Sequence, residues 1–384
     1  MTDKTDATAT DAAAFFAPLL SDWQPAADQS SYADYTASDL MTATGTAVNA
    51  DGKISLSFAM THRMALAVIE MPKTHYTFVD NVFPDYEAET PVQFISEAKP
   101  LSMDGGTHRY LVNPSQSAPT ITGSYDDGPK EFNIKPSVAQ GSYKTYKVDG
   151  GETIKKIHNL QIGDYILADG SLVGKDNLTE DRKASAIAVV FHVGQHVNDG
   201  SDYSATGIGR KQCHGYAVAL KDATSNYCKW GVYGTELGCC PTDAAGNKQN
   251  NYNNPDIDWC GYAWTQKIIT VAGGKGNLNA SDQAGYPATY YAVVAYETGC
   301  KAPTNSSGWF LPSIGQMWNI YQNRSSLFNG KAVVTSLKPD WYWSSSESYG
   351  SPANRALYVN VDLGDVSDGI KGGMISYVRP VLAF

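Results

Sequence analysis

The sequence lacks any cluster of basic residues and any apolar run long enough to span a membrane. Its 29 Lys and Arg stand against 39 Asp and Glu, for a formal net charge of −10. Without a basic patch to neutralise phosphates, nucleic acid is not expected as a partner. The length of 384 residues predicts two domains, and 35 Gly and 18 Pro favour strands joined by turns.

Cysteine is absent from the first 212 residues. The six cysteines are Cys213, Cys228, Cys239, Cys240, Cys260 and Cys300. Their spacing offers no pair of C-x-x-C hooks for zinc. An even number in a stretch rich in Gly, Asn and Tyr predicts local disulfides formed in an oxidising compartment, with the pairing open among about 15 connectivities. The alternative is six reduced, buried thiols.

Arginine is absent from the first 50 residues, where seven Asp stand against one Lys and leave a net charge of −6. Such a polar segment buries too little apolar surface to offset its ordering entropy, so residues 1–44 are predicted to be an acidic, largely flexible leader. Within it, Ala12 to Leu20 favour one short helix. No charged segment followed by an apolar one marks a secretory signal, so an exported protein of this sequence would be in its mature form.

Residues 45–155 are predicted to be an all-β sandwich. Ile54, Leu56, Phe58 and Met60 recur at every second position, which is typical of a half-buried strand. More β-type segments begin at His75, Thr90, His108, Pro119 and Gly141, with Gly and Pro between them. An exposed edge strand would suit assembly, with residues 12–40 as the piece exchanged or cleaved; the alternative is a simple spacer.

Residues 156–384 are predicted to be a second, α+β domain. Asp169-Gly170 is typical of a type I′ hairpin turn. The apolar runs beginning at Ala186 and Ala288 favour central strands. Ile314, Met317, Trp318 and Tyr321 follow a helical period after Ser313, which can cap the helix. Between residues 198 and 285 regular signals are few, and three β segments, WYWSSSE, RALYVNVDLG and ISYVRPVLAF, close the chain.

Two stretches resemble known families. The segment DGKISLSFAMTHRMALAVIEMP resembles the first strand pair of the Bacteroidales fimbrillin (Mfa-like, type V pilus subunit) family. IGDYILADGSL, GWFLPSIGQMWNIY, YWSSSE and YVRPVLAF, in this order, resemble the C-type-lectin-like domain of Bacteroidetes surface proteins, which is related to the formylglycine-generating-enzyme fold.

The resemblance implies a transthyretin-like, fimbrillin-like sandwich followed by a C-type-lectin-like domain. It also implies a cell-surface adhesin or fimbrial tip subunit, exported as an outer-membrane lipoprotein. Its partners would be other pilus subunits, through strand exchange, and a host or bacterial glycan or protein ligand. The alternative is a surface glycan-binding lipoprotein that never enters a pilus.

The last residues also resemble the variable region of proteins diversified by retroelements. That resemblance implies a display of Asp362, Leu363, Asp365, Ser367, Asp368, Gly369, Ile370, Gly372, Gly373 and Met374. It implies a fixed frame of Trp343, Gly364, Lys371, Val378 and Arg379.

No catalytic motif is found in the sequence. It contains no G-x-S-x-G, no Gly-rich phosphate loop and no H-E-x-x-H. His192 and His196 are four apart but lie among strand and turn signals, which argues against a metal pair. The formylglycine-generating relatives oxidise with a C-terminal cysteine pair, and this chain has no cysteine after Cys300. We therefore predict a non-enzymatic protein with no cofactor and no metal.

The tail combines aromatic rings with carboxylates and amides, the groups that bind sugars or peptides. The candidate ligand-binding residues are Tyr342, Glu347, Tyr349, Asn354, Tyr358, Asn360, Asp362, Asp365, Asp368 and Met374. For the aromatic residues the alternative is core packing, and for the aspartates it is a solvated turn. The spacing of three between Asp362, Asp365 and Asp368 is not that of a calcium-binding EF-hand loop.

Overall fold

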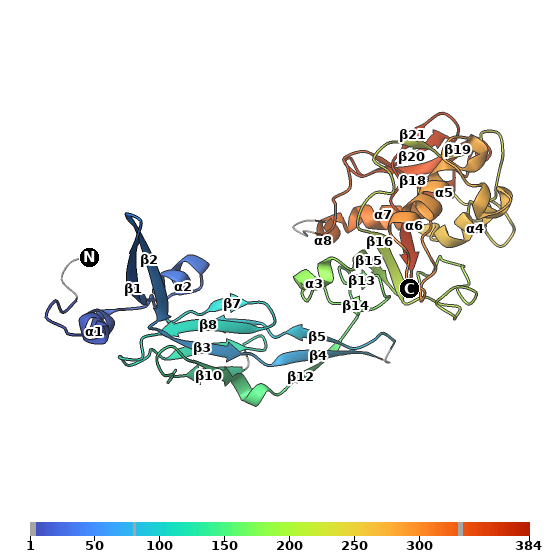
Figure 1. Ribbon diagram of the computed structural model, residues 1–384. Helices are drawn as coiled ribbons and strands as arrows, with labels where there is room; N and C mark the ends of the chain where they lie inside the picture. Colours follow the sequence, from blue (N-terminus) through green and yellow to red (C-terminus); the bar gives the residue numbers. More distant parts are fainter. Residues whose placement is uncertain (1–4, 80–81, 129, 329–332) are drawn as a thin grey trace. The chain divides into compact units, whose positions relative to one another are not determined.

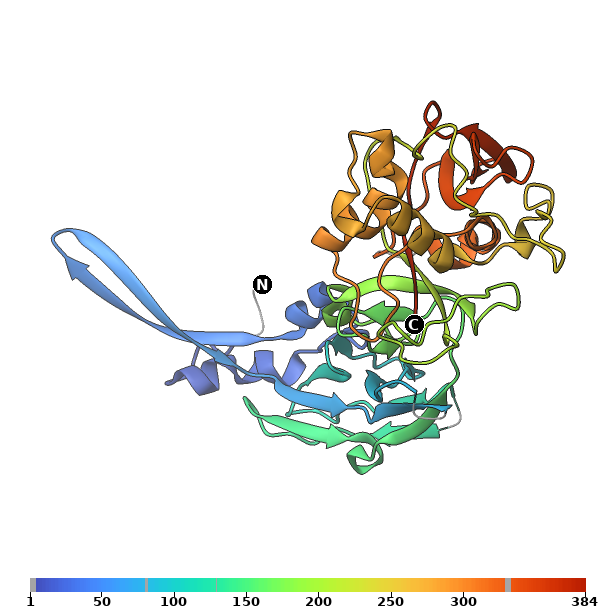
Figure 2. The ribbon, with the colours of Figure 1, turned by 90° about the vertical axis from the view of Figure 1, so that its right-hand side faces the viewer.

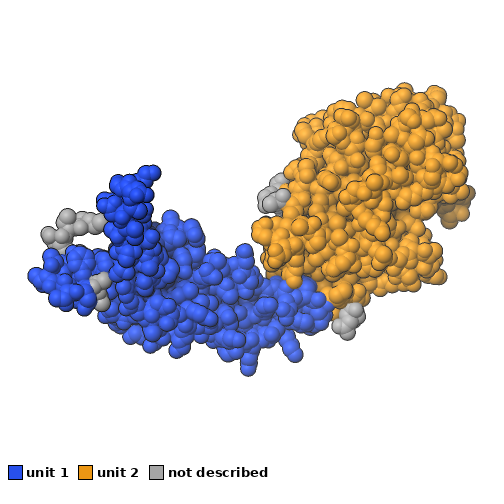
Figure 3. Space-filling view, viewed as in Figure 1, with its two compact units in different colours: residues 1–77, 85–157 blue, residues 78–84, 158–384 orange. Residues whose placement is uncertain are grey.

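The computed structural model describes residues 5–79, 82–128, 130–328 and 333–384, and it divides into two compact units. Unit 1 consists of Met1–Thr77 and Asp85–Ile157, and unit 2 of Phe78–Pro84 and His158–Phe384 (Figure 3). The chain therefore passes between the units three times: within β4 (Lys73–Phe78), after Pro84, and within β12 (Ile154–His158).

Unit 1 is built from short strands around one core. One sheet has the order β11 (Tyr143–Lys147), β3 (Ala65–Glu70), β8 (Thr107–Val112) and β7 (Leu101–Met103). A second has β10 (Lys130–Ile134), β9 (Ile121–Tyr125) and β6 (Val92–Phe94), and a third has β12, β4 and β5 (Tyr86–Glu89). Along β3, Ala65, Ala67 and Ile69 alternate inward, and they pack with Tyr110 and Ile121 in the core.

The hairpin of β1 (Met41–Ala50) and β2 (Lys53–His62) projects away from the other strands of unit 1 (Figures 1 and 2). The alternation predicted for β2 is real, but the prediction that it is half buried is wrong. Ile54, Leu56, Phe58 and Met60 are 71%, 60%, 62% and 57% exposed. Within the described residues, this two-stranded sheet has no layer packed on it.

The described part of the segment predicted to be a flexible leader, residues 5–44, is folded as part of unit 1 instead, and residues 1–4 lie outside the described residues. The folded part forms α1 (Ala12–Asp22) and α2 (Tyr32–Ser38). The fully buried Gln29 exchanges two hydrogen bonds of 2.9 Å with the backbone of Leu111 in β8. The Asn113 amide donates to the carbonyls of Leu20 and Trp23. These long-range amide contacts fix a segment whose composition predicts disorder.

Unit 2 contains a five-stranded sheet and a three-stranded sheet. The first has the order β14 (Leu172–Val173), β13 (Tyr165–Leu167), β15 (Ala186–Val193), β16 (Gly215–Ala219) and β22 (Val381–Ala383). The second has β18 (Trp341–Glu347), β19 (Arg355–Asn360) and β20 (Asp365–Ile370), while β17 (Cys228–Lys229) pairs with β21 (Ile375–Ser376). The apolar run from Ala186 is thus a central strand, as predicted.

Helix α7 (Ile314–Gln322) packs against β15, β18 and β19 and begins as predicted at Ser313. Ser313 and Gln316 form a reciprocal capping box. The apolar run from Ala288, predicted to be a strand, is helical instead: α5 (Pro287–Tyr290), a π-helical turn (Tyr291–Ala295) and α6 (Tyr296–Gly299) follow one another. Pro287 occupies the first helical turn, where its missing N–H costs nothing.

The remaining helical elements are short, apart from α4. They are η2 (Val148–Gly151) in unit 1, and α3 (Glu180–Lys183), η3 (Pro255–Ile257), α4 (Gly261–Val271), η4 (Lys275–Asn277), η5 (Gln283–Gly285) and α8 (Arg324–Phe328) in unit 2. Among the residues that the structure describes, no helix has the length and apolar character needed to cross a bilayer.

Candidate functional site

The three-stranded sheet of unit 2 carries most of the predicted ligand-binding residues, and its inner side is tightly packed. The Trp343 indole is fully buried and donates to the carbonyl of Cys228 at 2.8 Å. The ring of Tyr358 meets it edge to face at 5.0 Å. Gly369 in β20 lies so close to both rings that a Cβ atom there would come within 2.5 Å of Tyr358. The sheet is therefore a rigid support.

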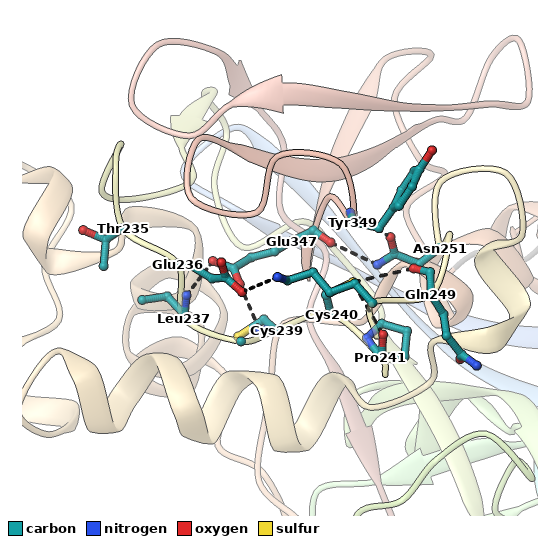
Figure 4. Close-up of polar contacts among 12 residues, drawn as sticks. Thr235, Glu236, Leu237, Cys239, Cys240, Pro241, Gln249, Asn251, Glu347 and Tyr349 are labelled. Atoms are coloured by element: carbon teal, nitrogen blue, oxygen red, sulfur yellow. Dashed lines mark hydrogen bonds and ion pairs between the residues drawn. The ribbon is translucent and has the colours of Figure 1, made fainter. Parts of the chain in front are cut away.

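A buried ion pair joins the end of β18 to the turn after β20. Glu347 Oε1 lies 2.5 Å from Lys371 Nζ, and both side chains are fully buried. The Glu347 carboxylate also accepts from the backbone N–H groups of Leu237 and Cys239 at 2.8 and 2.9 Å (Figure 4). Burial lowers the pKa of Lys371, and the facing Glu347 carboxylate opposes that shift.

The network continues through two more fully buried side chains. The Asn251 amide donates to the Glu347 carbonyl at 3.0 Å and to Asp258 Oδ2 at 3.2 Å, while its oxygen accepts from the Tyr349 N–H (Figure 4). Trp264 Nε1 donates to the other oxygen of Asp258 at 2.8 Å. Burial raises the pKa of Asp258 despite these donors. Together these contacts attach the segment around residues 235–258 to β18.

Four predicted ligand-binding residues lie in the interior, and for them the prediction is wrong. Tyr342, Glu347 and Tyr358 are buried, and Tyr342 donates its hydroxyl hydrogen to Asp222, which also pairs with Arg379. Asn360 is buried, and its Oδ1 accepts from the N–H groups of Asp362 and Leu363, which shapes the turn between β19 and β20.

The other six predicted residues are accessible but do not come together. The strand register places Asn360 opposite Asp365 and Arg355 opposite Ile370, so the two ends of β20 lie at opposite ends of the sheet. Asp362 and Asp365 are exposed at the first end. Exposed Tyr349 and Met374 and half-buried Asn354 and Asp368 belong to the second. Asp368 is already bound by Arg355 and Ser348.

The residues expected as a frame are interior: Trp343, Lys371, Val378 and Arg379 are fully buried. Among those expected to be displayed, Leu363, Ile370 and Met374 are exposed, whereas Gly369 is buried. Gly364 has φ +75°, and a Cβ atom there would meet the Tyr321 hydroxyl at 2.1 Å.

The six cysteines are free thiols, which contradicts the predicted disulfides. Four are buried, and Cys260 and Cys300 are half buried. The thiols of Cys228, Cys239 and Cys260 donate to backbone carbonyls of Ser376, Trp264 and Asn198. Burial raises the pKa of Cys228, Cys240 and Cys260 to about 12. The thiols pack as small apolar groups.

His192 and His196 lie beside the buried Trp259. The His196 ring stacks on the indole at 4.0 Å, and the two imidazole centroids are 5.4 Å apart. Burial lowers the pKa of both histidines. Across the described ranges, no group of three His, Cys, Asp or Glu side chains is placed to hold a metal ion. The two histidines therefore belong to a cluster of aromatic rings that includes Trp259 and Tyr216 of β16.

Sequence reasoning missed the buried charges Asp199, Asp222 and Asp258. Asp199 Oδ2 accepts from the hydroxyls of Tyr203 and Tyr216 at 2.8 and 2.7 Å and fixes the loop before β16. Nothing in the local sequence distinguishes these aspartates from solvated turn residues. The only signal in the sequence is the pair Tyr203 and Tyr216, whose hydroxyl groups can donate hydrogen bonds to a buried carboxylate.

The fold defines a class: a β-rich protein of two units, one with a projecting apolar hairpin and one with a small sheet fixed by buried charges. No family model matches the sequence. The protein named "Putative fimbrium tip subunit Fim1C", from Bacteroides ovatus, is 30% identical over an alignment of 412 positions, which covers 94% of this chain and 72% of that protein. The chain therefore belongs to the family of fimbrial subunits that includes Fim1C.

A crystal structure of a fimbrial protein from Bacteroides ovatus ATCC 8483 is also similar. It shares 25% sequence identity, and the match covers 100% of this chain and 83% of that one with a TM-score of 0.47.

Proposed function

We propose that this fimbrial subunit is a surface adhesin of the fimbrium tip, in which unit 1 joins a neighbouring subunit and unit 2 binds a glycan or protein ligand without enzymatic chemistry. The similarity to a protein named as a tip subunit extends over 94% of the chain and so includes both units. The observation that carries the assembly role is the exposed apolar face of the β1–β2 hairpin.

That face follows from the strand register. Phe58 pairs with Gly45, Leu56 with Ala47 and Met60 with Ala43, and paired residues of antiparallel strands point to the same side. A Cβ atom on Gly45 would lie 2.8 Å from the Phe58 ring, so that ring covers the glycine. The opposite face carries Thr and Ser residues together with Val48 and Ala59. Between Asn49 near its tip and His62 at its base, this side of the hairpin is thus a continuous apolar strip.

A two-stranded hairpin is marginally stable in water unless another layer covers it. Here the two ends of the hairpin are joined at its base, because the Arg63 backbone N–H donates to the Leu40 carbonyl and the Arg63 side chain donates to the Thr42 hydroxyl. The long outer part has no cover among the described residues, and both strands keep a free edge. Free edges and an apolar strip suit strand addition by the adjoining fimbrial subunit, which would bury the strip.

The ligand-binding role rests on unit 2. The order of its motifs resembles a C-type-lectin-like domain, and Asp362, Leu363, Asp365, Ile370 and Met374 are exposed on a sheet whose inner side is fixed. A rigid support with variable surface residues is also what a retroelement-diversified tail needs. Sequencing this tail in related isolates tests that idea, because diversification would concentrate changes at the exposed positions.

The assembly role is tested by the double variant Leu56→Ser, Phe58→Ser in the producing bacterium. We expect the protein to reach the cell surface and to be missing from sheared fimbriae by immunoblot. The matched control is Ser55→Ala, Ser57→Ala on the opposite face, which should be incorporated normally.

Normal incorporation of the apolar-face variant would contradict the proposed hairpin interface. Immunogold labelling of the wild-type protein only on the cell body would instead favour a glycan-binding lipoprotein outside the pilus. Ligand binding is assayed separately on glycan and host-protein arrays with the Tyr349→Ala, Met374→Ala variant, whose two exposed side chains belong to the same end of the sheet and whose loss of signal is expected.

A further inference from the structure

A cavity of about 820 Å³ lies in unit 2, at one end of the five-stranded sheet. Its walls come from the turn between β13 and β14, the start of β15, the residues after β16, and the end of α6 with the segment that follows. This volume is in the range of pockets that hold small organic molecules. None of the candidate ligand-binding residues of the three-stranded sheet lines it.

The described residues that line this cavity include both apolar and charged side chains. Apolar side chains, among them Ile187, Leu220 and Ala302, line it together with several other alanines. Lys183, Lys221 and Lys301 also line it. Among the described residues that line the cavity, the only aromatic one is Tyr296, which is buried and offers no exposed ring on which a sugar could stack.

Among the described lining residues three lysines stand against one aspartate, and the Glu297 carboxylate beside them accepts from the Ala302 N–H at 3.3 Å. Lys183 pairs with Glu180, but neither Lys221 nor Lys301 has a carboxylate within ion-pair distance in the part of the chain that the structure describes. Within the described lining the acidic residue is Asp169, whose Oδ1 already accepts from the N–H and the hydroxyl of Ser171. Two exposed ammonium groups are therefore free to bind an anion.

Hydrogen bonds fix the walls in place. Arg379, fully buried, donates to the carbonyls of Leu220 and Thr335 at 2.9 and 2.6 Å. Trp309 Nε1 donates to the Cys300 carbonyl at 2.7 Å, and the Asn305 amide donates to the Gly170 carbonyl at 3.1 Å. A cavity formed in advance loses little free energy to ordering when a ligand enters.

We propose that this cavity binds an amphiphilic organic anion, with its apolar body against Ile187, Leu220 and Ala302 and its carboxylate or other acidic group at Lys221 and Lys301. The apolar lining residues disfavour a fully hydroxylated sugar, because its hydroxyl groups would lose hydrogen bonds to water there. This inference goes beyond the proposed function and does not depend on it.

The test uses calorimetric titration of the full chain with octanoate and with octylamine, which has the same apolar body and the opposite charge. We expect octanoate to bind with one site and octylamine not to bind. The double variant Lys221→Gln, Lys301→Gln should weaken octanoate binding by about tenfold or more. Lys229→Gln, at an exposed lysine of β17 that does not line the cavity, is the matched control.

A second readout locates the bound molecule. Cys300 lines the cavity, so octanoate should slow its alkylation, followed by mass spectrometry, without slowing that of Cys260. The Leu56→Ser, Phe58→Ser hairpin variant should bind octanoate like the wild type. Absence of octanoate binding, equal binding by the lysine double variant, equal binding of octylamine, or loss of binding in the hairpin variant would each overturn the proposal. None of these outcomes bears on fimbrial incorporation.

Discussion

At the residue scale, unit 2 depends on charges that are buried and fully bonded. The Glu347 carboxylate accepts from Lys371 and from two backbone N–H groups, so each of its oxygens has a partner. Removing one member of such a pair leaves the other charged and desolvated, which costs far more than the pair itself contributes.

Lys371→Met should therefore lower the free energy of unfolding of unit 2 by about 3–5 kcal/mol. Urea denaturation followed by tryptophan fluorescence measures this loss. Arg355→Gln is the matched control, because Arg355 pairs with Asp368 on the same sheet while remaining partly exposed. Its loss should stay below about 1 kcal/mol. Equal losses in the two variants would show that burial of the Glu347–Lys371 pair does not matter.

The prediction that Glu347 is exposed is wrong for a physical reason. In an Asp- and Tyr-rich tail, an acidic residue is most simply interpreted as exposed. Glu347 is buried because its partners come from Leu237 and Cys239, more than a hundred residues earlier, and from Lys371. Local sequence carries no trace of contacts at that distance.

At the element scale, a strictly periodic pattern of apolar residues predicted the element correctly where a capping residue also marked its end. Helix α7 follows its 3.6-residue period and its Ser313 cap. In strand β2 the alternation of apolar residues predicted the strand correctly but not its burial. Burial depends on whether another layer covers the strand, and the alternation does not contain that information. Strand β20, with the sequence DVSDGI, was missed because its weak strand propensity is overridden by pairing with β19.

The prediction of a hairpin at Asp169-Gly170 is confirmed, but the predicted type I′ turn is wrong. β13 and β14 do pair, but their loop has four residues, and of the Asp169-Gly170 pair only Gly170 has a positive φ. A type I′ turn needs positive φ at both central residues.

The long segment from residue 198 to residue 285 needs no disulfide to keep its shape. Buried side chains such as Asp199, Asn251 and Asp258 hold it through hydrogen bonds. We expect six titratable thiols per chain after denaturation without reductant, and the same melting temperature with and without reductant. Fewer than six thiols would mean that cysteines pair after export.

At the scale of the whole molecule, acidity should weaken unit 2. Burial lowers the pKa of His192 and His196, and burial together with Arg210 lowers that of His214 to about 4. The unfolded chain, with histidine pKa values of about 6.5, binds protons at a pH where the folded unit does not. Stability is therefore full above about pH 6.5 and falls as the pH drops from there towards 4.

The measurement is the melting temperature at pH 5.0, 7.5 and 8.5. We expect a lower melting temperature at pH 5.0, and we expect these histidines to cause no difference in melting temperature between pH 7.5 and pH 8.5. His214→Gln should reduce the drop at pH 5.0. An unchanged drop in that variant would assign the acid sensitivity to other groups.

The way the chain is shared between the units has a mechanical consequence. Unit 2 includes Phe78–Pro84, and Phe83 packs there against His214 and Phe384. The backbone therefore crosses between the units at three points instead of one. A tensile load between the units would be carried by the backbone within β12 and, through the packing of Phe83, by the other two crossings. A protease that cut the chain within β12 would leave His158–Phe384 held by that packing instead of by a covalent bond.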